Sequence, residues 1–204
     1  MIYQRGFSPN QRSVAAQLYA DAFERKFFKL LGNKAKIVQL FQLGLNSQFC
    51  FVAIDEENQL VGLLGFRVGS NQLLSLKRRE FQQVFGALSG LFKSLVTTVI
   101  FHRKPESDEQ LLMDGVAVSA EVRGQGIGSK LFNELITYAR SQGFKSVRLD
   151  VIDENPRAKD LYAAIGFAPV EHKKVPWPIK NLIGVSGVTT MILQLPLVAK
   201  ESSQ

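Results

Sequence analysis

The chain has 204 residues, of which 46% are hydrophobic and 21% charged, with a formal net charge of +7; these values are typical of a globular protein with a sizeable core. Its one cysteine, Cys50, excludes a disulfide framework and a cysteine-based metal site, and the surrounding run FCFVAI favours a small buried core residue. His102 and His172 stand far apart among basic neighbours, so we expect no metal site, and the lack of an apolar leader predicts a cytoplasmic protein.

The first 70 residues predict a strand, two helices and a hairpin, in that order. Residues 2–6 are compatible with a short strand. Apolar residues recur at helical spacing over residues 11–31, and a second helical stretch follows up to Leu45. The segments QFCFVAI and NQLVGLLGFRVG then read as two strands joined by the acidic turn DEEN, which is a hairpin signal.

Residues 71–109 form an insertion, and the pattern predicts one long helix over residues 71–101. Polar residues, among them Lys93, interrupt its apolar part, so it falls short of an uncharged span of about 18 residues and a transmembrane helix is rejected. Residues 67–104 carry seven Lys and Arg against one acid, Glu80. Two interpretations stay open: a buried or subunit-facing helix, or a basic amphipathic segment that touches a membrane or an acidic substrate.

The second half of the chain predicts a βαβ unit followed by a helix and a last strand. LLMDGVAV is a strand, the loop SAEVRGQG leads into a helix over residues 127–142, and SVRLDV is the next strand. NPRAKDLYAAIGF predicts a helix capped by Gly166, Pro176 and Pro178 indicate a loop, and GVTTMILQLPL is the last strand. No repeat or domain boundary is visible, so we predict one α/β or α+β domain over residues 1–204 with a mixed sheet.

The segment RGQGIGSKLF places three glycines in five residues at the start of a helix. Unpaired amides and the positive end of the helix dipole attract a phosphate, and glycine lets a bulky anion approach closely. A P-loop does not fit, because GSK inverts the Ser and Lys of that motif and Ser129 stands where its second glycine is required. A dinucleotide fingerprint fits only in part, because its third glycine is replaced by Leu131 or Ser129, although Asp150 follows at the expected distance.

A third interpretation of this loop fits without change. RGQGIG matches the pattern R/Q-x-x-G-x-G, and here the sequence resembles the GNAT-type N-acetyltransferase superfamily. MDGVAVSAEVRGQGIGSKLF is similar to that family's strand–loop–helix unit, and NPRAKDLYAAIGFAPV is similar to its later unit of asparagine, helix, tyrosine and GF. The resemblance covers residues 111–170; the insertion and KKVPWPIKNLIGVSG match no family motif. It implies a central, mostly antiparallel sheet flanked by helices, with the insertion between strands 3 and 4.

The resemblance implies acetyl-CoA as co-substrate and requires no metal. Amides at the start of the helix would surround the pyrophosphate, and the Ser129 hydroxyl would add a further donor. The backbone of the preceding strand would pair with the pantetheine arm. Asn155 would hydrogen-bond the same arm, although a role as helix N-cap explains this asparagine equally well. The implied cofactor-binding residues are Val116, Ala117, Val118, Arg123, Gly124, Gln125, Gly126, Ile127, Gly128, Ser129 and Asn155.

Tyr162 is the candidate for the catalytic acid. The resemblance places a tyrosine one helical turn before GF, where it would protonate the departing CoA thiolate. A phenol, with its pKa of about 10, can supply that proton if it is held near the sulfur. The alternative is a tyrosine that only packs between helix and sheet.

Asp114 is the candidate for the catalytic base. A lysine-like amine, with its pKa of about 10.4, is almost wholly protonated at pH 7, so a base is useful before attack. Asp114 is the acid within LLMDGVAV, and strand alternation puts it on one face with Leu112 and Val116. Glu121 on the loop and Glu24 on the early helix are weaker alternatives. A backbone amide near Val116 would face the oxyanion.

These features predict an N-acetyltransferase that moves an acetyl group from acetyl-CoA to a primary amine by direct attack in a ternary complex. A non-catalytic acyl-CoA-binding regulator of the same fold stays open, but it would not need Tyr162. Nucleic-acid binding is not expected, because LKRRE has few interleaved aromatics and no binding module is recognisable. The basic character of the insertion and of the loop over residues 172–187 suggests an acceptor with a carboxylate or phosphate. The apolar insertion equally permits a hydrophobic acceptor, a longer acyl group or a homodimer contact.

Overall fold

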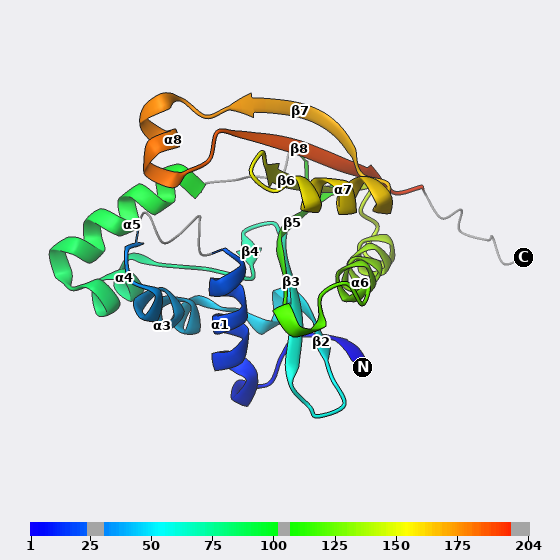
Figure 1. Ribbon diagram of the computed structural model, residues 1–204, viewed down its shortest axis with the longest axis horizontal. Coiled ribbons are helices and arrows are strands. Elements are labelled where there is room, and N and C mark those ends of the chain that lie inside the picture. The colour runs from blue at the N-terminus through cyan, green and yellow to red at the C-terminus, as the bar shows by residue number, and fades with distance from the viewer. Residues whose placement is uncertain (24–30, 102–106, 197–204) are drawn as a thin grey trace, which may run out of the picture.

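The computed structural model describes residues 1–23, 31–101 and 107–196. These residues form a sheet of eight strands with helices on both faces (Figure 1). The strands are β1 (Ile2–Arg5), β2 (Cys50–Ile54), β3 (Leu60–Val68), β4 (Asn71–Gln72), β5 (Gln110–Val118), β6 (Ser146–Ile152), β7 (Ala168–Lys174) and β8 (Gly187–Gln194). The α-helices are α1 (Arg12–Ala22), α3 (Lys34–Gly44), α4 (Arg78–Phe85), α5 (Ala87–Phe101), α6 (Ile127–Ser141), α7 (Pro156–Ile165) and α8 (Trp177–Ile183).

The order of the strands in the sheet is β1-β2-β3-β5-β6-β8-β7, and β4 pairs with β3 outside this path. All paired strands are antiparallel except β5 and β6, which are parallel and are joined through α6. The predicted βαβ unit and the mixed, mostly antiparallel sheet are therefore confirmed. Parallel neighbours need a long crossover, which the loop and α6 supply.

Two hydrophobic clusters hold the helices on the sheet, one on each face. α1 and α3 pack on one face together with α4, and α6 and α7 pack on the other. Leu131 and Leu135, on the predicted apolar stripe of α6, are wholly buried in the second cluster. Cys50 is wholly buried in the first, and burial raises the pKa of its thiol to about 12, which fits the predicted core role.

The insertion is not the single long helix that its pattern predicts. It starts with the short strand β4, which folds back onto β3 through a turn at Gly69. Its helical part is divided into α4 and α5 at Gly86, whose φ of +86° favours glycine and ends α4. The outer face of α5 is exposed, so the interpretation as a fully buried helix is wrong. Among the described helices, none is long and apolar enough to cross a membrane.

The segment over residues 172–187 is not the loop that its two prolines indicate. It holds the end of β7, the helix α8 and the first residue of β8. Pro176 is the N-cap of α8 and Pro178 lies in its first turn, where a missing amide hydrogen costs no intrahelical bond. The strand β7 was not predicted. All seven of its residues are exposed, so its sequence does not show the alternation of apolar and polar residues that indicates a strand.

Candidate active site

Strands β5 and β6 separate next to the glycine loop. Their parallel pairing covers only residues 110–112 of β5 and 146–148 of β6, whereas β5 stays paired with β3 on its other edge as far as Val118. The edge formed by residues 113–118 of β5 therefore has no partner strand within the described part of the chain. Backbone groups along such an edge can hydrogen-bond an extended ligand that contains amides.

A β-bulge at Asp114 lies where the two strands part. Residues 65 and 66 of β3 lie opposite Gly115 and Met113, so Asp114 is an extra residue in β5. The bulge shifts the alternation of faces: Met113 and Val116 both pack under α6, whereas a Cβ on Gly115 would meet Phe23 on the α1 side. The expectation that Asp114 shares a face with Val116 is therefore wrong.

The glycine loop leaves its backbone amides open. Gly124 and Gly126 have φ angles of +82° and +76°, and a Cβ built on either would meet nothing within 4 Å. Gly126 is the N-cap of α6, and no hydrogen bond is found from the amides of residues 124–129 to another described residue. Open amides, free space and the positive end of the helix dipole together suit a phosphate-bearing ligand.

The side chains of the predicted cofactor-binding segments mostly serve the fold. Arg123 Nε donates to the Val118 carbonyl oxygen at 3.1 Å, which ties the loop to the end of β5. Ile127 and Ala117 are buried in the two core clusters. These positions therefore offer a ligand their backbone groups, as the resemblance implies for the strand.

Asn155 is the N-cap of α7. Its Oδ1 accepts a hydrogen bond from the Ala158 amide at 3.2 Å, which is the cap that the sequence offered as an alternative. The cap uses only the carbonyl oxygen of the side chain, so its NH2 group can still donate to a ligand. The predicted contact with pantetheine stays a prediction.

Tyr162 lies in the contact between α6 and α7. Its ring packs against Phe132 with the ring centroids 5.4 Å apart and against Phe167 at 6.2 Å. Burial raises the pKa of its phenol to about 12, so the group is protonated at neutral pH. We find no hydrogen bond to its hydroxyl among the described residues. A protonated donor with no acceptor among the described residues suits an acid that acts on a ligand.

Asp114 lies on the opposite face of the sheet and forms an ion pair with Arg67 of β3. The distance from Arg67 Nη2 to Asp114 Oδ1 is 3.6 Å, and both side chains are largely buried. Pairing offsets the cost of burying the carboxylate. The two candidate catalytic residues thus lie on opposite faces of the sheet, with Tyr162 on the α6 side and Asp114 on the α1 side.

Two ion pairs were not predicted from the sequence, that of Asp114 with Arg67 and that of Arg148 with Asp150. Arg67 is the only charged residue in NQLVGLLGFRVG, and this isolation in an apolar strand was the signal that it has a buried partner. On β6, Arg148 Nε lies 3.7 Å from Asp150 Oδ1, and the Thr190 hydroxyl donates to the same carboxylate oxygen at 2.8 Å. The spacing of two between Arg148 and Asp150 puts both on one strand face.

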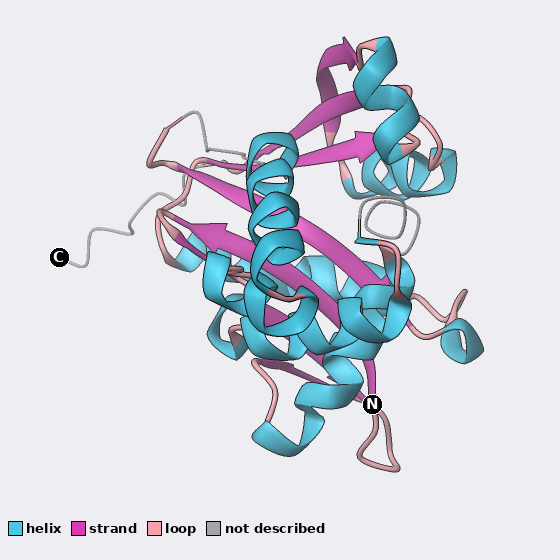
Figure 2. Ribbon diagram, turned by 90° about the vertical axis from the view of Figure 1, so that its left-hand side faces the viewer, coloured by secondary structure: helices cyan, strands magenta, loops and turns pink. Residues whose placement is uncertain are grey.

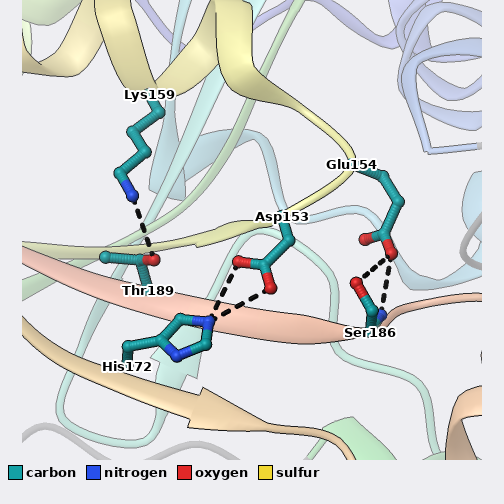
Figure 3. Close-up of polar contacts among 6 residues, drawn as sticks. All are labelled: Asp153, Glu154, Lys159, His172, Ser186 and Thr189. Atoms are coloured by element: carbon teal, nitrogen blue, oxygen red, sulfur yellow. Dashed lines mark hydrogen bonds and ion pairs between the residues drawn. The ribbon is translucent and has the colours of Figure 1, made fainter.

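The segment between β6 and α7 is tied to the last two strands (Figure 3). His172 Nε2 of β7 lies 3.1 Å from the Asp153 carboxylate. The Glu154 carboxylate accepts hydrogen bonds from the Ser186 amide at 2.8 Å and from its hydroxyl at 2.6 Å. Partial burial acts to raise the pKa of Glu154, but the hydrogen bonds from Ser186 outweigh it and the pKa is lowered. These contacts fix the backbone that leads into Asn155.

Glu121 is the alternative base on the loop before α6. Glu121 accepts a hydrogen bond from the Ser119 hydroxyl, which lowers its pKa and makes it a weaker base. Glu24 and His102 lie outside the described residues. Residues 1–23, 31–101 and 107–196 contain no group of three His, Cys, Asp or Glu that could hold a metal. An open depression of about 610 Å³ lies at the end of β1, lined by residues 4–8, 47 and 48, and includes none of the predicted site residues.

Comparison with known proteins gives a family match over most of the chain. The profile described as "Acetyltransferase (GNAT) family" matches residues 15–167. The thialysine N-epsilon-acetyltransferase of Bos taurus is 43% identical over 56 residues, which cover 28% of this chain and 33% of that protein. The probable N-acetyltransferase camello of Xenopus laevis is 39% identical over 62 residues, 30% of this chain and 28% of that protein. The chain thus spans about a third of the length of these curated relatives.

Solved structures share the fold over almost the whole chain. An N-acetyltransferase from Staphylococcus aureus superposes with a TM-score of 0.65 at 18% identity, covering 95% of this chain and 100% of that one. A phosphinothricin acetyltransferase from Sinorhizobium meliloti, solved in complex with AcCoA, superposes with a TM-score of 0.55 at 15% identity, covering 95% and 88%. At such identities the likeness concerns the fold alone. The profile match over residues 15–167, on this fold, shows that the chain belongs to the GNAT acetyltransferase family.

Proposed function

We propose that the protein transfers the acetyl group of acetyl-CoA to a primary amine by direct attack in a ternary complex. The observation that carries the proposal is the gap between β5 and β6, which has open amides at one end, with the candidate acid and base on opposite faces of the sheet. The amides of residues 124–129 would hold the pyrophosphate, and the free edge of residues 116–118 would pair with the pantetheine arm. Asn155 would donate to that arm from its NH2 group.

The residues around the gap would divide the chemistry between the two faces of the sheet. Asp114, on the α1 side, takes a proton from the attacking ammonium group, directly or through water. The amine nitrogen then bonds to the acetyl carbon and gives its second proton to water, and the bond from that carbon to sulfur breaks. Tyr162, on the α6 side, gives its proton to the sulfur that leaves, and solvent reprotonates the phenol. A backbone amide near Val116 faces the oxyanion that forms between these steps.

The acceptor is proposed only as a class. The thialysine N-epsilon-acetyltransferase relative is named for an aliphatic amine, and a lysine-like side-chain amine is the acceptor that we would test first. Three basic side chains are exposed at the start of α4, those of Lys77, Arg78 and Arg79. An acceptor that carries a carboxylate or phosphate is therefore a candidate together with a hydrophobic acceptor.

Calorimetry and a turnover assay on the same preparation test the proposal. We expect acetyl-CoA to bind and to be consumed in the presence of a panel of aliphatic amines that includes thialysine, with free CoA released in equal amount. Binding without turnover of any amine would favour the non-catalytic acyl-CoA-binding regulator. No binding by well-folded protein would contradict both. Native mass spectrometry of the same sample also reports the number of subunits and thus tests the homodimer.

A further inference from the structure

The helix α5 turns large apolar side chains outward, unlike a helix that packs on the core of a soluble protein. Its outward residues Leu88, Phe92 and Leu95 are 85%, 66% and 59% exposed, and their spacing of four and three places them on one face. We call these three residues the outer stripe. They are among the larger apolar side chains of the helix, and water surrounds all three in the isolated chain.

The inward face of α5 contains small and polar residues beside Val96, which packs against the first core cluster. Gly90, Ser94 and Thr97 are buried, and a Cβ on Gly90 would lie 2.6 Å from the Gln82 backbone nitrogen, so α4 and α5 approach each other closely. Lys93 also turns inward: its Nζ lies 3.3 Å from the Leu31 carbonyl oxygen and 5.2 Å from the Phe85 ring centroid. Close packing through small residues with large apolar residues outside is the arrangement of a helix whose outer face meets lipid.

A second apolar element lies on the same side of the molecule. α8 stands above α5 in Figure 1, and this is the side that faces the viewer in Figure 2, where α5 is the long helix in front. On α8, Trp177 is 74% exposed and Ile179 is 39% exposed. Tryptophan is enriched where protein meets the headgroup region of a bilayer, because its ring is apolar and its N–H can reach water or headgroups.

The positive charge around α5 and α8 indicates which kind of partner this side can bind. Five basic residues within residues 77–101 and 173–187 are exposed: Lys77, Arg78, Arg79, Lys174 and Lys180. Lys93 turns inward, and Lys173 pairs with Glu171 at 2.9 Å. Glu80 is already engaged, because Arg79 Nε lies 2.7 Å from its Oε1. Two copies that met through this face would bring like charges together, which opposes self-association. An anionic bilayer offers an apolar interior to the outer stripe and negative headgroups to the lysines and arginines.

We propose that the face formed by α5 and α8 docks on an anionic lipid bilayer, with the outer stripe and Trp177 in the interfacial region and the surrounding basic residues against the headgroups. The proposal does not depend on acetyl transfer. It describes peripheral attachment, with the helices lying on the membrane and not spanning it.

Vesicle flotation of the full chain tests the docking face. Wild-type protein is mixed with vesicles of phosphatidylcholine alone or of phosphatidylcholine with phosphatidylglycerol. We expect flotation with the anionic vesicles, weaker flotation with the neutral ones, and release as salt is raised. The triple variant Leu88→Ser, Phe92→Ser, Leu95→Ser is expected to bind about tenfold or more weakly, because three apolar anchors are lost.

A matched variant and an independent readout control for damage to the fold. Val170→Ser removes an apolar side chain that is 56% exposed, close to the exposure of Leu95, but lies on β7 outside the docking face; it should float like wild type. Circular dichroism of the triple variant should match wild type. Folded wild type that does not float, or a triple variant that floats equally well, would overturn the proposal. So would wild-type dimers that become monomers in the triple variant without any vesicle binding, because the partner would then be a second copy.

Discussion

The helices α5 and α6 place their large apolar side chains in opposite directions. Leu131 and Leu135 of α6 are wholly buried against the sheet, whereas Leu88 and Phe92 of α5 are largely exposed. Both helices have apolar residues at helical spacing, so their sequence patterns look alike. An apolar stripe therefore predicts a helix with a covered face, but the pattern does not say whether this chain's own sheet or another medium covers it.

The same substitution in the two helices tests this comparison most strongly. Leu131→Ala should lower the free energy of unfolding by about 3 kcal/mol, because it leaves a cavity in the core. Leu88→Ala should change it by less than about 0.5 kcal/mol, because the side chain is solvated before and after. Urea unfolding measures both values. A loss of similar size in both variants would mean that Leu88 is covered in solution.

Tyr162→Phe tests whether a residue of the core cluster on the α6 side also takes part in catalysis. We expect kcat to fall about a hundredfold, since the acid for the leaving thiolate is lost, while acetyl-CoA affinity stays unchanged. Because the phenol pKa is about 12, loss of its proton should not limit the wild-type rate below about pH 11. Rates should instead rise with pH as the acceptor amine is deprotonated.

Tyr138→Phe is the matched control for this variant. Tyr138 is also on α6's side of the sheet, where its ring lies 5.1 Å from that of Phe66 and beneath the Arg5 guanidinium, but it has no proposed part in the reaction. Its variant should turn over at the wild-type rate. Equal rates for Tyr162→Phe and wild type would leave Tyr162 as a packing residue only.

The glycine loop permits a paired test at the two ends of α6. Gly126 and Gly143 have φ angles of +76° and +79°, and a Cβ on either meets nothing within 4 Å. Each change to Ala should therefore cost a similar amount of stability, about 1 kcal/mol. Only Gly126→Ala should raise the Kd for acetyl-CoA, by about tenfold, because it disturbs the amides that hold the pyrophosphate. If calorimetry found the same Kd for Gly126→Ala and for Gly143→Ala, acetyl-CoA would have to bind elsewhere.

Features set by neighbours in sequence could be predicted before the structure. The helix α6 follows from its apolar spacing, and Gly166, with a φ of +107°, is the left-handed C-cap that its position after NPRAKDLYAAI indicates. The glycine loop was found for the same reason: unpaired amides at a helix start are a local property. These are the parts of the candidate site that the resemblance also covers.

Features that depend on distant strands could not be predicted. The bulge at Asp114 exists because residues 65 and 66 of β3 pair with Gly115 and Met113, and strand alternation read along β5 alone gives Val116 the wrong face. The partner of Asp114, Arg67, comes from a strand more than forty residues away in the chain. For β7, edge exposure removes the alternation that would have indicated a strand.

The contact between Glu154 and Ser186 lies between the proposed docking face and the candidate site. Its loss is expected to have the smallest effect on the free energy of unfolding. Ser186 follows α8, and Glu154 precedes α7, so the contact links the proposed docking face to the candidate site. Since the folded pKa of Glu154 is lowered, its stabilisation is present above the unfolded pKa, about 4.5, and is lost as pH falls through the folded value. Ser186→Ala should therefore lower the free energy of unfolding by about 0.5 kcal/mol at pH 7, a value kept small because the carboxylate is largely solvated.

Urea unfolding at several pH values measures this difference, which should shrink toward pH 3. Ser141→Ala is the control. It removes a hydroxyl bonded to a backbone carbonyl oxygen at 2.8 Å, and its difference from wild type should not vary with pH. A gap between Ser186→Ala and wild type that stayed constant down to pH 3 would show that the Glu154 charge does not contribute to the contact.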